Sequence, residues 1–247
     1  NKLYLSGRQP NQIYNNCAGK HLAMLTSCIV NNFPIKNYVD FDHPHQKNIR
    51  KVFSKFTEDT ITKKNYGIDG CSAPQYAFTI EKLGKALSNL LNSYNGNFEY
   101  SENIQTMINA ILDNPTFIGG SKNLDSNLIK ISNRNIFCKG GAEGVFLFVH
   151  LKKRIFGILK VKDGNERALP SAMYTLMKRF RILNKNIIIS QWNEDPVMPS
   201  LQYSKQNVYD KLKVTDTLEV VAHIHITNLC CDALLRISTQ IPYGLSG

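Results

Sequence analysis

The chain has 247 residues, of which 43% are hydrophobic, 10% aromatic and 20% charged, a composition typical of a globular protein with a sizeable core. Its formal net charge is +11, but the lysines are scattered and no basic stripe with interleaved aromatics occurs, so nucleic-acid binding is disfavoured. No apolar run of about 18 residues predicts a membrane span. No signal peptide is recognisable and the six cysteines form no C-x-x-C pair, so we expect a cytoplasmic protein with free thiols.

Apolar residues recur at helical spacing through the first half of the chain. A short loop over 66–74, with an Asp-Gly step and a proline, interrupts this pattern. Helices are predicted over residues 21–30, 45–57, about 77–91, 102–112 and 124–131.

Short segments rich in β-branched and aromatic residues dominate the second half of the chain. Their connections are brief, which favours antiparallel pairing. Helices come first and strands come later, which is typical of an α+β fold rather than of regular βαβ alternation. Strands are predicted over 135–139, 145–151, 155–162, 185–190 and 218–226, with a helix within 163–180.

The segment "NNCAGKHLAML" at 15–25 places Cys17 and Lys20 one turn apart if a helix begins near Ala18. A helix N-terminus and a neighbouring ammonium both lower the pKa of a thiol. Cys17 is therefore a candidate thiolate that ligates a metal or attacks a carbonyl group. The alternative is a small buried thiol beside a solvated lysine.

A second cysteine, Cys71, lies in the loop "DGCSAP" just before a predicted helix, two residues after Asp69. Asp69 could orient a metal ligand by hydrogen bonding. Together, Cys17 and Cys71 offer two thiolates for a soft metal such as zinc, although spacing alone does not show that they meet. His223 and His225 alternate on a predicted strand and form a weaker metal candidate.

The segment "CKGGAEGV" at 138–145 is interpreted as a strand end, a glycine turn and a strand start. Gly140 and Gly141 allow close backbone approach or positive φ, and such a turn can offer N–H groups to an oxyanion or carboxylate beside Lys139. Arg167, in "KVKDGNERA", could pair with a substrate carboxylate. The alternatives are a plain hairpin turn and a solvated turn with a structural arginine.

Four segments, at 15–25, 66–78, 139–145 and 160–168, occur in one order that resembles the rhizobial-type, thermolabile L-asparaginases, or asparaginase II family. The segment at 41–53 is also similar to that family. The resemblance implies a serine-β-lactamase-like and glutaminase-like fold, with a helical region packed on an antiparallel sheet. It also implies hydrolysis of L-asparagine to L-aspartate and ammonia.

The resemblance assigns roles to individual residues. Cys17, Lys20 and Cys71 match the family's zinc ligands, and Asp69 matches a residue that supports the zinc site. Lys139 is the best match for the catalytic lysine of the family's second Ser-Lys pair. Lysine binds zinc only as the neutral amine, so the resemblance implies a depressed pKa for Lys20, which burial beside the metal could supply.

No S-x-x-K occurs anywhere in the sequence, although family members carry one upstream that supplies the nucleophilic serine and its lysine. The resemblance implies that this chain starts after that point, is N-terminally incomplete and has impaired activity. We expect one domain over 1–226 and a C-terminal extension of uncertain order over 227–247. L-Asparagine is the expected partner, and a homodimer stays open.

Two other functions also stay open. The chain is alternatively a non-catalytic remnant of the family that binds zinc or a protein partner. A cysteine hydrolase with Cys17 or Cys71 as the nucleophile is disfavoured, because no histidine with an Asp or Asn partner is identifiable in the sequence.

Overall fold

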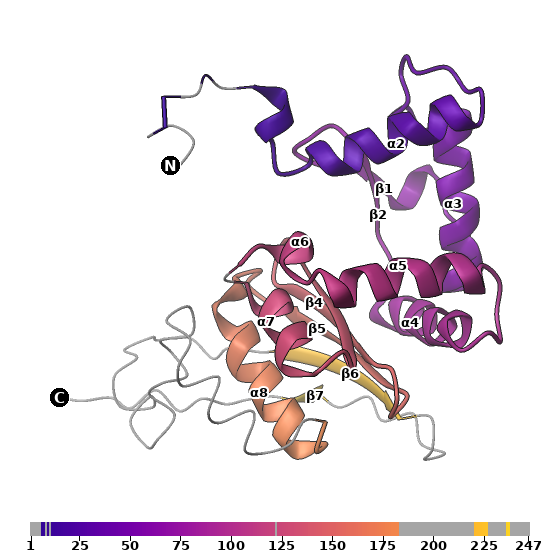
Figure 1. The fold of residues 1–247 in the computed structure, drawn as a ribbon. Helices are drawn as coiled ribbons and strands as arrows, with labels where there is room; N and C mark the ends of the chain where they lie inside the picture. Colours follow the sequence, from indigo (N-terminus) through magenta and orange to yellow (C-terminus); the bar gives the residue numbers. More distant parts are fainter. Residues whose placement is uncertain are drawn as a thin grey trace. The chain divides into compact units, whose positions relative to one another are not determined.

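The computed structural model describes residues 6, 7, 9, 11–121, 123–182, 220–226 and 236–237. The chain divides into two units, Asn1–Thr79 and Ile80–Gly247, and each is treated separately below (Figure 1). The expectation of one domain over 1–226 stays a prediction. None of the helices in the described part of the chain has the length and apolarity of a membrane span.

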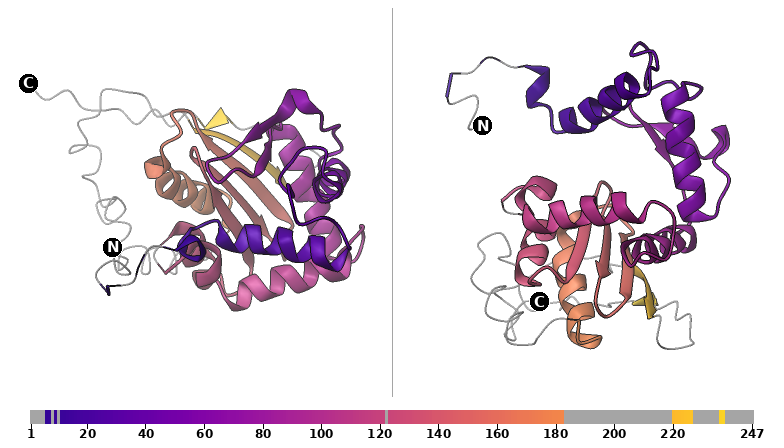
Figure 2. Two further views of the ribbon diagram at one scale, coloured as in Figure 1. Left: turned by 90° about the horizontal axis from the view of Figure 1, so that it is seen from above. Right: turned by 45° about the vertical axis from the view of Figure 1, so that its right-hand side comes forward.

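The first unit combines helices with one small hairpin. Figure 2 shows its two long helices crossing at a steep angle rather than lying parallel. The hairpin pairs its two strands antiparallel, with Tyr66 opposite Tyr76 and Ile68 opposite Pro74. The elements are η1 (Gln12–Tyr14), α2 (Ala18–Val30), α3 (Pro44–Thr57), η2 (Lys63–Asn65), β1 (Tyr66–Ile68) and β2 (Pro74–Tyr76).

Local signals explain where α3 begins. Pro44 occupies its first turn, where a missing N–H costs no hydrogen bond. His43 caps the helix, because its Nδ1 accepts a hydrogen bond from the N–H of His45 at 3.1 Å. The other ring nitrogen, Nε2, lies 2.9 Å from the carbonyl oxygen of Pro34. One side chain thus fixes both the helix start and the loop before it.

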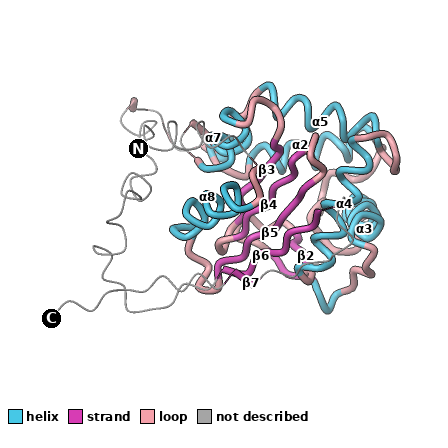
Figure 3. The backbone as a smooth tube through the Cα atoms, turned by 90° about the horizontal axis from the view of Figure 1, so that it is seen from below, coloured by secondary structure: helices cyan, strands magenta, loops and turns pink. Residues whose placement is uncertain are grey.

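The second unit is built on a five-stranded antiparallel sheet in the order β3-β4-β5-β6-β7. Figure 3 shows these strands side by side, with α8 lying against them. The strands are β3 (Ile136–Gly141), β4 (Val145–His150), β5 (Ile155–Val161), β6 (Val220–Ile226) and β7 (Arg236–Ile237). The helices are α4 (Ile80–Tyr94), α5 (Ser101–Asp113), α6 (Thr116–Gly119), α7 (Leu124–Ile131), η3 (Glu166–Ala168) and α8 (Leu169–Arg179).

The core of this unit lies between the sheet and its helices. Phe146, Phe148 and Phe156 are fully buried on β4 and β5. Successive residues of β5 are buried instead of alternating, which indicates that both faces of this strand are covered. Helix α8 contributes Met173 and Leu176 to the same core. This packing fixes the end of β3, where Lys139 lies.

Mixed helices and antiparallel sheets confirm the prediction of an α+β fold. One local prediction was wrong. The helix expected from about 77 begins at Ile80, because Pro74–Tyr76 forms β2. Arg236–Ile237 forms the short strand β7 beside β6, and the expectation of a C-terminal extension over 227–247 stays a prediction. The strand expected at 185–190 lies outside the described residues.

Candidate functional site

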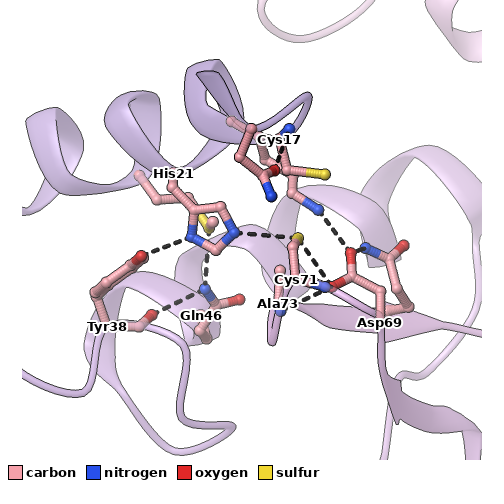
Figure 4. A network of polar contacts seen from close by, with 11 residues as sticks. Cys17, His21, Tyr38, Gln46, Asp69, Cys71 and Ala73 are labelled. Carbon is pink, nitrogen blue, oxygen red and sulfur yellow. Dashed lines mark hydrogen bonds and ion pairs between the residues drawn. The ribbon is translucent and has the colours of Figure 1, made fainter. Parts of the chain in front are cut away.

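The first unit brings together the four residues that the sequence singled out near α2 and the β1–β2 hairpin. Figure 4 shows Cys17, Cys71 and Asp69 close together, with dashed lines that join Cys71 to Asp69 and to His21. The Nζ of Lys20 lies 2.6 Å from Oδ2 of Asp69. The Cys71 side chain is within hydrogen-bonding reach of both Cys17 and Lys20. The convergence that spacing alone did not show is therefore present in the fold.

The hairpin loop is organised by the carboxylate of Asp69. Its Oδ1 accepts hydrogen bonds from the N–H groups of Cys71 and Ala73, each at 2.9 Å, and from the Cys71 thiol at 3.0 Å. Ser72 completes the turn with a left-handed φ of 70°. Cys71 therefore lies in a turn between two strands. The prediction that it precedes a helix was wrong, because strand β2 follows it.

His21 is a member of this cluster that the sequence interpretation missed. Its Nε2 lies 3.1 Å from Sγ of Cys71, and its Nδ1 lies 2.6 Å from the hydroxyl of Tyr38. Because the Cys71 thiol donates to Asp69, its sulfur is left to accept from Nε2, and Nδ1 then accepts from Tyr38. The available signal was spacing, since His21 follows Cys17 by one helical turn.

The ion pair between Lys20 and Asp69 shifts the pKa values of both groups. Burial would raise the pKa of Asp69, but hydrogen bonds from Cys71, Lys20 and the N–H of Ala73 outweigh it and hold that pKa well below its usual range. Burial would lower the pKa of Lys20, but its hydrogen bonds with Asp69 and Cys71 outweigh burial and raise it. Without a metal, Lys20 is therefore the charged partner of Asp69.

The expected thiolate at Cys17 is not what the metal-free geometry favours. A hydrogen bond with Cys71, and then burial, raises the pKa of the Cys17 thiol, although the charge of Lys20 partly opposes this. Cys17 does occupy the N-cap of α2, as predicted. The helix N-terminus and the Lys20 ammonium would lower the pKa of Cys17, but the Cys71 thiol and the Asp69 carboxylate nearby raise it by more.

The donor chemistry of this cluster fits zinc, which prefers sulfur and nitrogen ligands in tetrahedral sites. Cys17, Cys71 and Lys20 supply two sulfurs and one amine, and His21 brings an imidazole against Cys71. In the described part of the chain, no three His, Cys, Asp or Glu side chains are grouped as a metal site. Lys20 is the charged partner of Asp69 in this geometry, and an amine ligates zinc only after it loses its proton.

Lys139 lies in the second unit, on β3, opposite Leu147 of β4. Its Nζ is 3.6 Å from Oδ2 of Asp125, and it also donates to the carbonyl of Gly140. The same Oδ2 accepts a hydrogen bond from the N–H of Gly140 at 3.2 Å. Asp125 is only 3% exposed and was missed by the sequence interpretation. No sequence pattern links it to Lys139.

Gly140 and Gly141 lie within β3 and not in the hairpin turn. Neither has a positive φ; the left-handed residues of this connection are Glu143 at 60° and Gly144 at 65°. The predicted strand, turn and strand are present over 138–145, but Gly140 and Gly141 are not in the turn, because β3 continues through both glycines before the backbone reverses at 142–144.

The other candidate residues lie elsewhere on the second unit. The guanidinium of Arg167 pairs with Asp163 at 2.5 Å, and the N–H of Arg167 donates to Oδ1 of Asn165. Its role toward a substrate carboxylate stays a prediction. His223 and His225 lie on β6, opposite Ile158 and Phe156 of β5.

Comparison with known proteins places these residues in a family context. No curated protein matches the chain significantly. The family model of L-asparaginase II matches residues 1–208. The matched range includes Cys17, Lys20, Asp69, Cys71 and Lys139, so both candidate sites lie inside it. The chain therefore belongs to the L-asparaginase II family.

Proposed function

We propose that this chain is an amidohydrolase that converts L-asparagine and water to L-aspartate and ammonia. The family match over residues 1–208 is the observation that carries the proposal. The two residue clusters support it, because they hold the positions that resemblance assigns to a zinc site and to a catalytic lysine. For unit 2, we also propose a serine-β-lactamase-like arrangement, supported by its antiparallel sheet and packed helices.

Amide hydrolysis breaks the carbon–nitrogen bond of the substrate's amide group, adds a hydroxyl oxygen to the carbonyl carbon and gives the leaving nitrogen a proton. A lysine serves this reaction by taking a proton from a nucleophilic hydroxyl and delivering one to the leaving group. Lys139 suits that task because its side chain is half exposed, at 49%, while its ionic partner Asp125 is buried. The ammonium is thus anchored on one side and accessible on the other.

Substrate contacts are proposed at Gly140, Gly141 and Arg167. Neither glycine carries a side chain next to Lys139, so a substrate can approach the end of β3 closely. The N–H of Gly140 already donates to Asp125, so we assign Gly140 to close approach rather than to oxyanion binding. Arg167 is the cation proposed for the substrate carboxylate, in exchange for its exposed partner Asp163.

Zinc is the proposed cofactor of the first unit, held by Cys17, Lys20 and Cys71. Bound zinc would polarise a carbonyl group or acidify a water molecule. Asp69 supports the site by fixing the turn that carries Cys71. It also accepts a hydrogen bond from the Lys20 ammonium, a bond that would break if the amine became a zinc ligand. His21 holds the sulfur of Cys71 from the other side.

Ammonia release from L-asparagine tests the proposal. One arm uses the 247-residue protein. A second arm fuses the serine–lysine segment of a rhizobial-type L-asparaginase ahead of residue 1. Turnover in either arm supports the function, and turnover in the second arm alone shows that the nucleophile must be supplied. A folded, zinc-loaded protein without ammonia release in both arms contradicts it and leaves non-catalytic zinc binding as the function.

A further inference from the structure

A buried carboxylate stands at the start of α7, directly behind Lys139. Asp125 is 3% exposed, whereas the charged side chains of soluble proteins usually reach water. Burying a carboxylate is costly unless it is paired and hydrogen-bonded. Both carboxylate oxygens of Asp125 have partners in this structure.

The partners of Asp125 are two consecutive residues of β3 and its own helix. Oδ2 lies 3.6 Å from Nζ of Lys139 and accepts from the N–H of Gly140 at 3.2 Å. Oδ1 accepts from the N–H of Ser126 at 2.9 Å. One carboxylate thus holds both the backbone at the end of β3 and the ammonium that this backbone carries.

A glycine, Gly119, makes room for the carboxylate of Asp125. A Cβ atom at Gly119 would stand 1.9 Å from Oδ1 of Asp125, which is a severe clash. A Cβ atom at Gly140 would stand 3.6 Å from Oδ2, which is ordinary contact. The recess therefore accommodates Asp125 because position 119 has no side chain.

We propose that Asp125 is the positioning residue for Lys139, an inference that rests on the proposed function. The Nζ of Lys139 forms an ion pair with Asp125 and donates a hydrogen bond to the carbonyl of Gly140, and both contacts hold it against β3. These two contacts restrict where the amine can lie and leave the half-exposed side chain of Lys139 accessible to an approaching hydroxyl. Holding a reacting group in place removes part of the entropic barrier to proton transfer.

Asp125→Asn is the informative variant. An amide oxygen can still accept from Gly140 or Ser126, but the negative charge opposite Lys139 is lost. In the turnover assay we expect kcat to fall about a hundredfold, since positioned proton transfer contributes that much or more, while KM stays within about twofold. A variant that raises KM alone, with unchanged kcat, would overturn the positioning role.

A second readout does not depend on turnover. Brief acetylation followed by mass spectrometry compares Lys139 with Lys130, an exposed lysine of α7, in the same sample. Because Asp125 and the carbonyl of Gly140 hold the Lys139 amine against β3, we expect Lys139 in the unaltered protein to react about tenfold more slowly than Lys130. Asp125→Asn should remove most of that difference.

The two readouts separate two failures. If the unaltered protein does not release ammonia, the proposed function fails, yet slow acetylation of Lys139 still supports its pairing with Asp125. If Lys139 and Lys130 react equally fast in the unaltered protein, the inference about Asp125 is wrong whatever the activity. This comparison needs no variant, so it also decides the case if Asp125→Asn does not fold.

Discussion

The ammonium of Lys20 lies 2.6 Å from the carboxylate of Asp69, although 49 residues separate the two in the sequence. This pair joins the first turn of α2 to the loop of the β1–β2 hairpin. It therefore brings Cys17 and Cys71 to the same place and sets the charge around both thiols.

Removing the Asp69 side chain should destabilise the hairpin loop. Asp69→Ala leaves the N–H groups of Cys71 and Ala73 without their acceptor and deprives Lys20 of its partner. We expect a loss of about 2 kcal/mol in the free energy of unfolding, measured by urea denaturation. Asp69→Asn, which keeps an acceptor oxygen, should cost less.

The matched control is Asp42→Ala. Asp42 pairs with Lys63 at 3.2 Å, but both side chains are 69% exposed. Such a pair contributes about 0–1 kcal/mol, so the control should change stability little. Equal losses for Asp42→Ala and Asp69→Ala would show that the loop does not depend on the Asp69 carboxylate.

Zinc content tests the metal proposal. The purified protein should hold about one zinc ion, detected by mass spectrometry of the metal, because two thiols and an amine converge at one place. Cys17→Ala and Cys71→Ala should each lose the metal. Cys28→Ala, which removes a fully buried thiol on the same helix, should retain it. Zinc-free protein with freely titratable Cys17 and Cys71 thiols would contradict the site.

Two further variants identify the nitrogen ligand. Lys20→Met removes the amine and His21→Gln removes the imidazole that contacts Cys71. Because the resemblance assigns the ligand role to lysine, zinc affinity should fall more in Lys20→Met. The reverse order would assign the metal to His21 and leave Lys20 as a partner of Asp69 alone.

Stability should fall in mild acid. Burial, with a smaller contribution from Lys153, lowers the pKa of His150 below its ordinary 6.5. The unfolded state then takes up its proton at higher pH than the folded state does, so stability is full above pH 6.5 and declines as the pH falls below it. Thermal unfolding midpoints between neutral and mildly acidic pH measure this decline.

His150→Asn is the matched variant for this acid effect. Nδ1 of His150 accepts from the N–H of Lys153 at 3.2 Å, and an asparagine oxygen can take that place without titrating. The variant should show a flatter pH dependence. Burial, and then the neighbouring His43, also lowers the pKa of His45, so some slope should remain. An unchanged slope in His150→Asn would refute the assignment.

A methyl group at position 119 should disrupt the recess behind Lys139. In Gly119→Ala the new Cβ would stand 1.9 Å from Oδ1 of Asp125, and overpacking of this kind costs about 1–3 kcal/mol. Gly19→Ala is the control, because nothing lies within 4 Å of its Cβ position in α2. That variant should be neutral or more stable by up to about 1 kcal/mol. Comparable stability of both variants would show that the recess yields easily.

Periodicity predicted the long elements of the fold well, because α2, α3, α5 and α7 carry apolar residues at helical spacing. It did not predict the hairpin of β1 and β2, since strands of three residues are too short to show alternation. For this reason Cys71 was predicted to precede a helix, whereas it precedes strand β2. Its neighbourhood is determined by the bonds of Asp69, not by a helix end.

Only those site residues that belong to local sequence motifs could be predicted. Cys17, Lys20 and Cys71 carry motifs that resemblance detects one segment at a time. Asp125 and His21 act through contacts with residues distant in sequence, Lys139 and Cys71, and such contacts exist only after folding. The fall of the Asp69 pKa and the rise of the Cys17 pKa likewise depend on this convergence.

The rate of ammonia release from L-asparagine after Lys139→Met is the sharpest test of Lys139 as the catalytic lysine. The measurement uses whichever protein is active, the 247-residue chain or its fusion to a serine–lysine segment, and compares Lys139→Met with Lys130→Met, which removes an exposed lysine of α7. Lys139→Met should reduce kcat about a hundredfold or more, whereas Lys130→Met should leave it unchanged. Full activity in folded Lys139→Met would contradict the assignment of Lys139 as the catalytic lysine.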